Sequence, residues 1–192
     1  MGPAGAVREP VLPPPTAMSM TRNTGFTLIE LVVALLVLGI VVGLAAPSFQ
    51  SLVERSRAQA VFHGLTASLA GARLAAVQLN RPVTVCPTLD GLRCRRDLVW
   101  DDGWMTYIDA GRGDHPASAE AVIRREGPAD GRIAVRGSSG RHRVRFQPSG
   151  WASGANISLR VCSRPARKLL GEVVVNNAGR PRSERRDAAE NS

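Results

Sequence analysis

One unbroken apolar segment near the N-terminus limits what this chain of 192 residues can become. Residues 31–46 carry no polar side chain, and the longer block 26–46 is interrupted only by Thr27 and Glu30. At about 1.5 Å per residue, a helix of that length is roughly 30 Å long, which matches the hydrocarbon core of a bilayer. The segment is therefore predicted to cross a membrane once.

Glu30 is the unusual residue of this block. A carboxylate inside a bilayer costs at least a few kcal/mol unless a partner neutralises it. A secretory signal would place small residues of a cleavage site after its apolar run, whereas here the distinctive residues 25–30 precede the run. The segment is therefore expected to be retained, with Glu30 serving a purpose.

The front of the block carries a resemblance to a known leader. A short basic segment, residues 20–24, precedes the string Gly25-Phe26-Thr27-Leu28-Ile29-Glu30. This string resembles the leader of type IV pilins and type II secretion pseudopilins. The resemblance implies that a prepilin peptidase cuts after Gly25 and methylates the new N-terminal Phe26. It also implies that Glu30 pairs with the α-amino group of a neighbouring subunit, which makes its burial tolerable.

Residues 1–25 would then form a leader that is removed. Pilin leaders of this type are short and basic, whereas residues 1–19 are rich in proline and carry a single arginine. We therefore expect translation to start at Met18 or Met20. The transmembrane helix is assigned to residues 26–47.

The pattern that follows predicts an amphipathic helix over residues 48–80. Apolar residues recur at alternate steps of four and three, which places them on one face of a helix. These residues are Ala58, Phe62, Leu65, Leu69, Ala72, Ala76 and Leu79. Arg81-Pro82 is expected to end the helix.

Short strands divided by Gly, Pro and Asp turns fill the region 81–178. The predicted strands are 82–86, 104–109, 121–126, 132–136, 143–147, 156–162 and 172–176. The fold class is therefore α+β: one long N-terminal helix packs on a domain with an antiparallel β-sheet, and residues 179–192 form a basic C-terminal tail.

Several segments narrow the resemblance to the FimT/GspH branch of pilin-like proteins. They are Val85-Cys86-Pro87, Asp90-Gly91, Cys94, Trp100, Gly103-Trp104, Phe146-Gln147-Pro148-Ser149-Gly150 and Asn177-Ala178-Gly179-Arg180. The aromatic residues Trp100, Trp104 and Phe146 fall in or beside strands and are interpreted as packing residues.

The three cysteines would lie outside the cytoplasm, where disulfides persist. Cys86 and Cys94 close a short loop with turn residues, and this pair is the first choice. Cys86 with Cys162 is the alternative, because adjacent strands could bring them together. One cysteine is left over in either case.

The excess of basic residues is concentrated in one part of the chain. Of 25 basic residues, Lys168 is the only lysine. Residues 82–123 have a net charge of −3, whereas residues 124–186 hold fifteen basic against four acidic residues, a net charge of +11. A coding bias explains the ratio of arginine to lysine but not this segregation. A polyanionic partner would explain it.

Two basic clusters stand out. Arg141, Arg143 and Arg145 alternate along one predicted strand and would form a basic stripe. The second cluster is Arg164, Arg167, Lys168, Arg180, Arg182, Arg185 and Arg186. It includes Gly179-Arg180-Pro181-Arg182, which resembles a Gly-Arg-any-Arg motif of FimT-type minor pilins. That resemblance implies binding of double-stranded DNA during natural transformation.

Two other interpretations of the second cluster stay open. Its arginines could neutralise local acids in a solvated tail, or they could contact anionic lipid head groups. If DNA is the partner, two guanidinium groups would contact phosphate oxygens without reading bases. Binding would then be independent of sequence and sensitive to salt.

The function predicted from these features is that of a minor pilin. It would be anchored by a single pass in the bacterial inner membrane with a periplasmic domain, and later join other pilins in an extracellular pilus. The alternative is a minor pseudopilin of a type II secretion system, with pseudopilins as partners and no DNA binding. The scattered histidines His63, His115 and His142 match no catalytic or metal-binding spacing, so that no enzyme activity, metal or cofactor is predicted.

Overall fold

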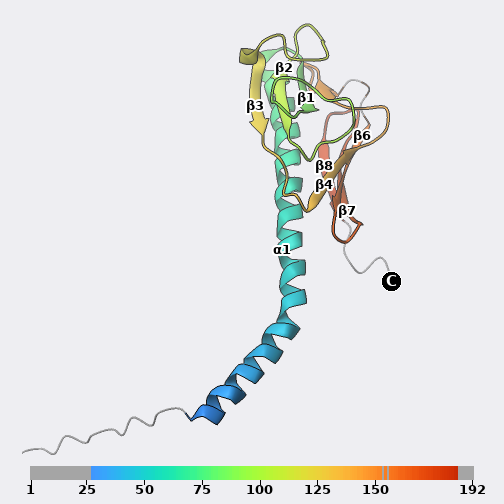
Figure 1. The fold of residues 1–192 in the computed structure, drawn as a ribbon. Coiled ribbons are helices and arrows are strands. Elements are labelled where there is room, and N and C mark those ends of the chain that lie inside the picture. The colour runs from blue at the N-terminus through green and yellow to red at the C-terminus, as the bar shows by residue number, and fades with distance from the viewer. Residues whose placement is uncertain (1–26, 153, 155, 186–192) are drawn as a thin grey trace, which may run out of the picture. The chain divides into compact units, whose positions relative to one another are not determined.

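A single helix, α1 (Leu28–Leu79), begins in the apolar block and continues past Pro47. In the computed structural model, residues 27–152, 154 and 156–185 are described (Figure 1). The helix was expected in two parts, 26–47 and 48–80, but its secondary structure is continuous. The chain divides into two units after Leu44, and the second of them, from Ala45 onward, contains the β-domain.

The second half of α1 packs one face against the β-domain. The buried apolar residues of the helix are Ala58, Val61, Phe62, Leu65, Leu69, Ala72 and Ala76, which is the predicted stripe with Val61 added. Leu79, expected in the stripe, is 47% exposed because the helix ends there. Asn80 follows with a φ of 49°, the left-handed conformation that commonly ends helices, and Pro82 cannot continue the helix.

The first sheet has four antiparallel strands in the order β3-β2-β1-β5. Its strands are β1 (Val83–Pro87), β2 (Trp104–Ile108), β3 (Val122–Glu126) and β5 (Val144–Phe146). The central pair aligns Val85 with Thr106, and β5 aligns Phe146 with Val83. A short 3-10 helix, Ala119–Ala121, precedes β3.

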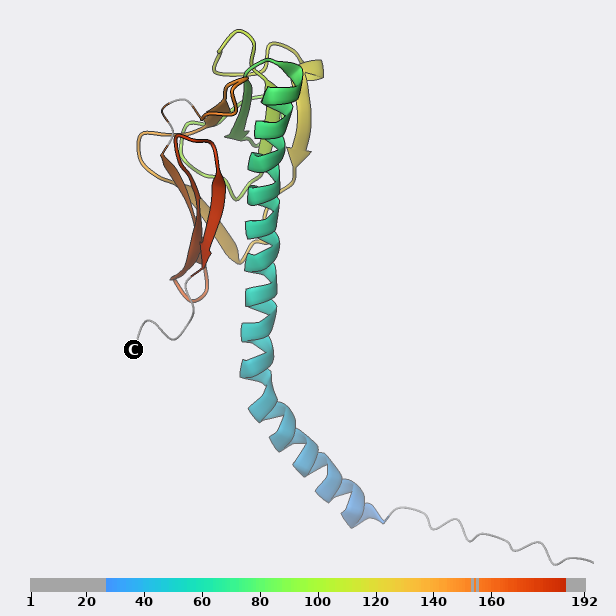
Figure 2. The ribbon, with the colours of Figure 1, turned by 180° about the vertical axis from the view of Figure 1, so that it is seen from behind.

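The second sheet has four antiparallel strands in the order β4-β6-β7-β8. Its strands are β4 (Ile133–Gly137), β6 (Ile157–Ser163), β7 (Lys168–Val175) and β8 (Pro181–Arg185). Alternate residues of β6 are buried, as a strand with one face on the core requires. Figure 2 shows β8 as the edge strand of this sheet.

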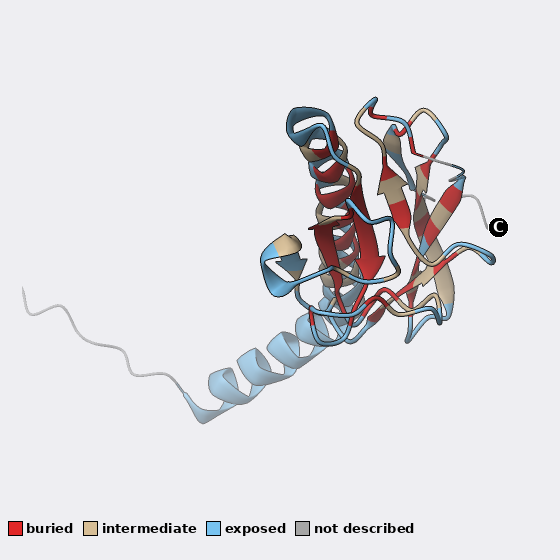
Figure 3. Cartoon of the chain, turned by 90° about the horizontal axis from the view of Figure 1, so that it is seen from above, coloured by how far each residue is buried: buried red, intermediate tan, exposed pale blue. Residues whose placement is uncertain are grey.

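The core lies between α1 and both sheets, as the buried residues in Figure 3 show. Trp100, Trp104 and Phe146 are at most 4% exposed and belong to it, so these aromatic residues pack as predicted. Trp104 Nε1 donates to Ser68 Oγ at 2.9 Å, which satisfies its polar atom inside the core. A second, smaller cluster of Cys86, Cys94, Met105 and Tyr107 is also buried.

Two expectations about the β-domain were wrong in detail. The predicted strands were assigned to one sheet but divide between two. The strand β4 pairs with β6, whereas β3 and β5, the strands before and after β4 in the sequence, belong to the first sheet. Alternation reports which face a residue occupies but not which strand lies beside it. Residues 181–185 were assigned to a tail but form β8, because an exposed edge strand pairs through its backbone and needs no apolar side chains.

Candidate functional site

No described residue covers the apolar half of α1. Its Leu, Val and Ile side chains from Leu28 to Leu44 are 42% to 81% exposed. The helix is long and apolar enough to cross a membrane, with a mean hydropathy of 2.9 in its most apolar window. Glu30 lies in its first turn, where its N–H donates to Thr27 Oγ1 at 3.3 Å. Gly25 and Phe26, the expected processing residues, lie outside the described residues.

Cys86 and Cys94 form a disulfide, which is the pairing expected first. The loop that it closes is held by Asp90, whose Oδ1 accepts from the N–H groups of Leu92 and Arg93, each at 2.8 Å. These hydrogen bonds lower the pKa of Asp90. The alternative partner, Cys162, is a free and partly exposed thiol on β6.

The basic stripe expected at residues 141–145 does not form a free cationic surface. Arg145 Nε lies 2.6 Å from Oδ2 of the buried Asp109, and Arg143 lies 2.6 Å from Asp114. Arg145 and Arg143 also donate to the carbonyl oxygen of Gly113. The stripe was a wrong expectation, because the acids that pair with it come from a loop distant in sequence.

A second pair of arginines is bound to one buried carboxylate. Arg136 and Arg164 both form ion pairs with Asp101, whose side chain is 4% exposed. The backbone of Asp101 also joins the network, because its carbonyl oxygen accepts from the Ala129 N–H at 2.8 Å. Arg164, predicted to bind DNA, therefore already has a structural partner.

The Gly179-Arg180-Pro181-Arg182 segment forms a rigid turn into β8. Gly179 has a φ of 71°, and a Cβ atom there would lie 2.2 Å from the carbonyl oxygen of Gly150. Only glycine fits this close approach. The Gly179 N–H donates to the Asn176 carbonyl oxygen at 2.8 Å, and the Arg180 N–H donates to Asn176 Oδ1 at 3.2 Å.

The two arginines of this segment differ in their surroundings. Arg180 is exposed, and no carboxylate pairs with it among the described residues. Arg182 is exposed on β8 and pairs with Glu184, 3.0 Å away. Such an exposed ion pair contributes little to stability, so that another anion can readily replace Glu184 as the partner of Arg182.

The predicted DNA-binding residues do not gather at one place. Arg164 and Arg167 lie in the turn between β6 and β7, and Lys168 begins β7, whereas Gly179 and Arg180 lie in the turn between β7 and β8. Figure 2 shows the two turns at opposite ends of the sheet. The length of β7, roughly 20 Å or more, separates the two turns. Arg185 pairs opposite Gly171 and so lies nearer the first turn, and Arg186 is outside the described residues.

A long helix whose first half is apolar and whose second half packs on antiparallel sheets defines a pilin-like subunit. The chain belongs to the family described as type II transport protein GspH, whose profile matches residues 62–179, more than half of the chain. A second profile, the prokaryotic N-terminal methylation motif, matches residues 20–46. The chain is thus a GspH/FimT-type minor pilin or pseudopilin.

Solved structures agree with this fold. The type IV minor pilin FimU of Pseudomonas aeruginosa, in a P21 crystal form, matches with a TM-score of 0.55 and 18% sequence identity over 69% of this chain and 92% of that chain. A second crystal form of FimU, P65, matches with a TM-score of 0.51 and 18% identity over 66% and 91%. Among curated proteins, none matches.

Family membership gives the general role of the chain. Pilins and pseudopilins are membrane-anchored structural subunits with a globular domain, they interact with one another, and prepilin peptidase processes them at the methylation motif. No cluster of metal-ligating side chains is found within the described part of the chain.

Proposed function

We propose that the protein is a minor type IV pilin that is cleaved after Gly25, anchored in the inner membrane by residues 26–47 and incorporated into a pilus through Glu30. The uncovered apolar half of α1 supports this proposal, because such a surface needs either lipid or other helices around it. Glu30 would receive the α-amino group of the neighbouring subunit as its partner. That pairing would act only after processing has exposed Phe26.

Replacement of Glu30 tests the assembly proposal. The variant Glu30→Ala should still be cleaved, as N-terminal sequencing would show, but should no longer enter sheared pili. Glu120→Gln removes one carboxylate from an exposed position and serves as the control. Normal amounts of Glu30→Ala in pili would contradict the proposed role.

The second part of the proposal is binding of double-stranded DNA along β8. The observation that carries it is the turn at Gly179, which presents Arg180 without a carboxylate partner among the described residues and leads into an exposed edge strand. Arg182 and Arg185 continue along the same strand. Guanidinium groups bind phosphate oxygens in bidentate geometry, and a rigid turn lowers the entropy lost on binding.

A binding measurement tests this part. The full chain in neutral detergent would be titrated into a fluorescent duplex, and anisotropy would be recorded from about 50 mM to about 200 mM NaCl. The double variant Arg180→Gln, Arg182→Gln should bind about tenfold more weakly at low salt and show a salt slope smaller by about two. The matched control is Arg93→Gln, Arg160→Gln, which removes the same charge elsewhere. Equal binding by both variants would remove the DNA proposal.

The alternative is a minor pseudopilin of a type II secretion system. The description of the matching family favours it, whereas the Gly179 turn favours the pilus. The pilin and the pseudopilin differ in the assemblies that they join. In a cross-linking experiment, a pseudopilin would be recovered with other pseudopilins in the periplasm. Its deletion would leave DNA uptake unchanged. Deletion that lowers DNA uptake without lowering secretion would support the pilus.

A further inference from the structure

The β6–β7 turn and its surroundings form a cationic surface, called here the hairpin end. It comprises Arg132, which lies beside the turn, Arg167 in the turn, Lys168 at the start of β7, and Arg185, which pairs opposite Gly171 of β7. Within the described ranges, no carboxylate forms an ion pair with any of these four side chains, whereas the adjacent Arg164 is paired with Asp101. The Arg164 N–H donates to the Arg132 carbonyl oxygen at 2.8 Å, which ties the turn to β4.

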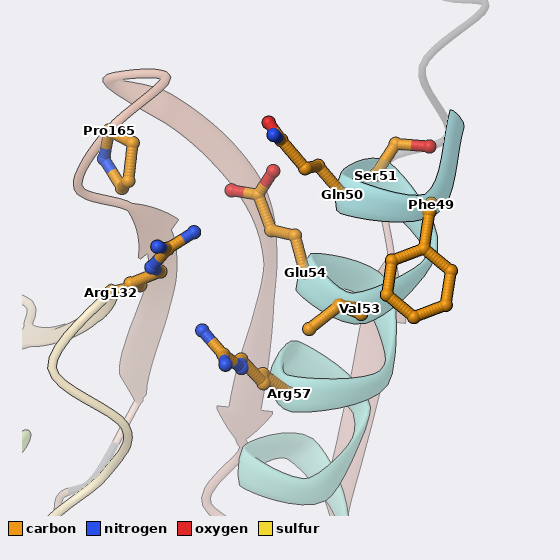
Figure 4. Close-up of a pocket in the computed structure, with 8 residues that line it drawn as sticks. All are labelled: Phe49, Gln50, Ser51, Val53, Glu54, Arg57, Arg132 and Pro165. Atoms are coloured by element: carbon orange, nitrogen blue, oxygen red, sulfur yellow. The ribbon is translucent and has the colours of Figure 1, made fainter. Parts of the chain in front are cut away.

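A groove of about 410 Å³ opens beside this surface, between α1 and the turn. Its apolar side chains are Phe49, Val53 and Pro165, and its charged side chains are Glu54, Arg57 and Arg132 (Figure 4). Arg57 lies 3.4 Å from Asp130. Glu54 Oε1 is buried and has no hydrogen-bond donor among the described residues. The groove therefore offers the Arg132 guanidinium group for an anion, and it contains an acceptor, Glu54 Oε1, that lacks a donor among the described residues.

The groove lies close to the end of the membrane segment along the chain. The apolar run ends at Ala46, so that Phe49 follows by about 5 Å and Arg57 by about 16 Å of helix. The polar region of a bilayer leaflet is about 5–8 Å deep, so that it reaches the near end of the groove at Phe49 and not Arg57. Phe49 and Leu52 are 66% and 62% exposed, which suits residues at the boundary between acyl chains and head groups.

We propose that the hairpin end binds phospholipid head groups while the protein is anchored in the membrane. Arg132, Arg167 and Lys168 contact lipid phosphates, and Phe49 and Leu52 lie at the level of the head groups. The proposal rests on membrane anchoring but not on DNA binding. Attraction of the cations to an anionic leaflet falls off within a Debye length and is weakened by salt.

Cys162 provides a native probe for this contact, because it is free, partly exposed and two residues before Arg164. The full chain would carry a fluorophore on Cys162 and be reconstituted in phosphatidylcholine vesicles with or without about 30% phosphatidylglycerol. A nitroxide on lipid head groups would quench the fluorophore when the hairpin end contacts the surface. Quenching should rise about twofold with phosphatidylglycerol and return to the lower level at about 500 mM NaCl.

Matched variants decide between the outcomes. Arg132→Gln, Arg167→Gln, Lys168→Gln should lose the extra quenching, whereas Arg132→Lys, Arg167→Lys should keep it. Arg81→Gln, Arg93→Gln, Arg112→Gln removes the same charge away from the hairpin end and should also keep it. Equal quenching in both vesicle types, or equal loss in both glutamine variants, would overturn the proposal. If the triple glutamine variant of the hairpin end lost DNA binding but kept the extra quenching, the hairpin end would be assigned to DNA.

Discussion

The arginines that contact Asp101 and Asp109 differ from those of the hairpin end and the Gly179 turn in their ion pairing. Arg136, Arg164 and Arg145 each contact a carboxylate that is almost fully buried. Arg167 and Arg180 are exposed and have no carboxylate partner within the part of the chain that the structure describes. The net charge of a segment therefore overstates its free cations, because some of its arginines neutralise acids from another segment. We call these two kinds paired and unpaired arginines, and only the unpaired kind is available to a polyanion.

The largest expected effect on stability comes from removing Asp101, the buried carboxylate that two paired arginines share. Asp101→Ala leaves Arg136 and Arg164 without their partner. It also removes Asp101 Oδ1, which accepts a hydrogen bond from the N–H of Val135 in β4. The loss in the free energy of unfolding should be about 2–3 kcal/mol: the buried Val135 N–H loses its acceptor, but the two arginines left behind are 41% and 47% exposed and regain water. Urea unfolding in neutral detergent, followed by tryptophan fluorescence, measures it because Trp100 and Trp104 are buried.

The neighbouring Asp102 gives a control of the same chemistry. It is also paired with an arginine, Arg95, but its side chain is 42% exposed. Asp102→Ala should therefore change the free energy of unfolding by less than about 1 kcal/mol. Equal losses in the two variants would mean that burial of the carboxylate does not distinguish the two kinds of arginine.

The second effect concerns the backbone that presents Arg180. Gly179→Ala places a Cβ atom against the Gly150 carbonyl oxygen and requires a left-handed conformation. We expect a loss of about 2 kcal/mol in the free energy of unfolding. DNA affinity should fall together with it, because the turn must open. Gly111→Ala, where a Cβ atom meets nothing within 4 Å, is the control. Normal stability of Gly179→Ala would show that the turn is not rigid.

The fold was largely predictable from the sequence, and the paired arginines were not. Steps of four and three identified the buried face from Ala58 to Ala76, because a helix repeats locally. The pairs of Arg145 with Asp109 and Arg164 with Asp101 join residues 36 and 63 positions apart. No local pattern encodes such contacts. β8 was missed for a related reason, since its pairing uses backbone groups that every sequence carries.

A smaller effect is expected from pH at His142, which lies near two arginines that are paired with Asp114. Burial lowers the pKa of His142, and the nearby Arg143 and Arg96 lower it further. Since the folded pKa lies below the usual 6.5, the stabilising contribution is full above that pH and is lost as the pH falls through the folded pKa. The urea midpoint should therefore decrease from about pH 7.5 to about pH 5.

The variant His142→Gln isolates this contribution. It cannot take up a proton, so that its urea midpoint should fall less over the same pH range. Other groups titrate in the wild-type chain, and the difference between the two proteins is the relevant quantity. Parallel pH profiles would show that His142 stays equally hydrated in the folded and unfolded chains.

The smallest effect tests whether a surface pair can be converted from one kind to the other. Glu184→Gln removes the partner of Arg182, which lies 3.0 Å away and is exposed. The free energy of unfolding should change by less than about 0.5 kcal/mol, because exposed ion pairs contribute little. DNA affinity at low salt should rise about threefold, since Arg182 becomes free and one repulsive charge disappears. Glu172→Gln, on the neighbouring strand, removes the same charge without freeing Arg182 and should raise the affinity less. If Glu184→Gln binds DNA no better than the wild-type chain, the phosphates do not reach β8 at Arg182, and the proposed interface would have to be confined to the Gly179 turn.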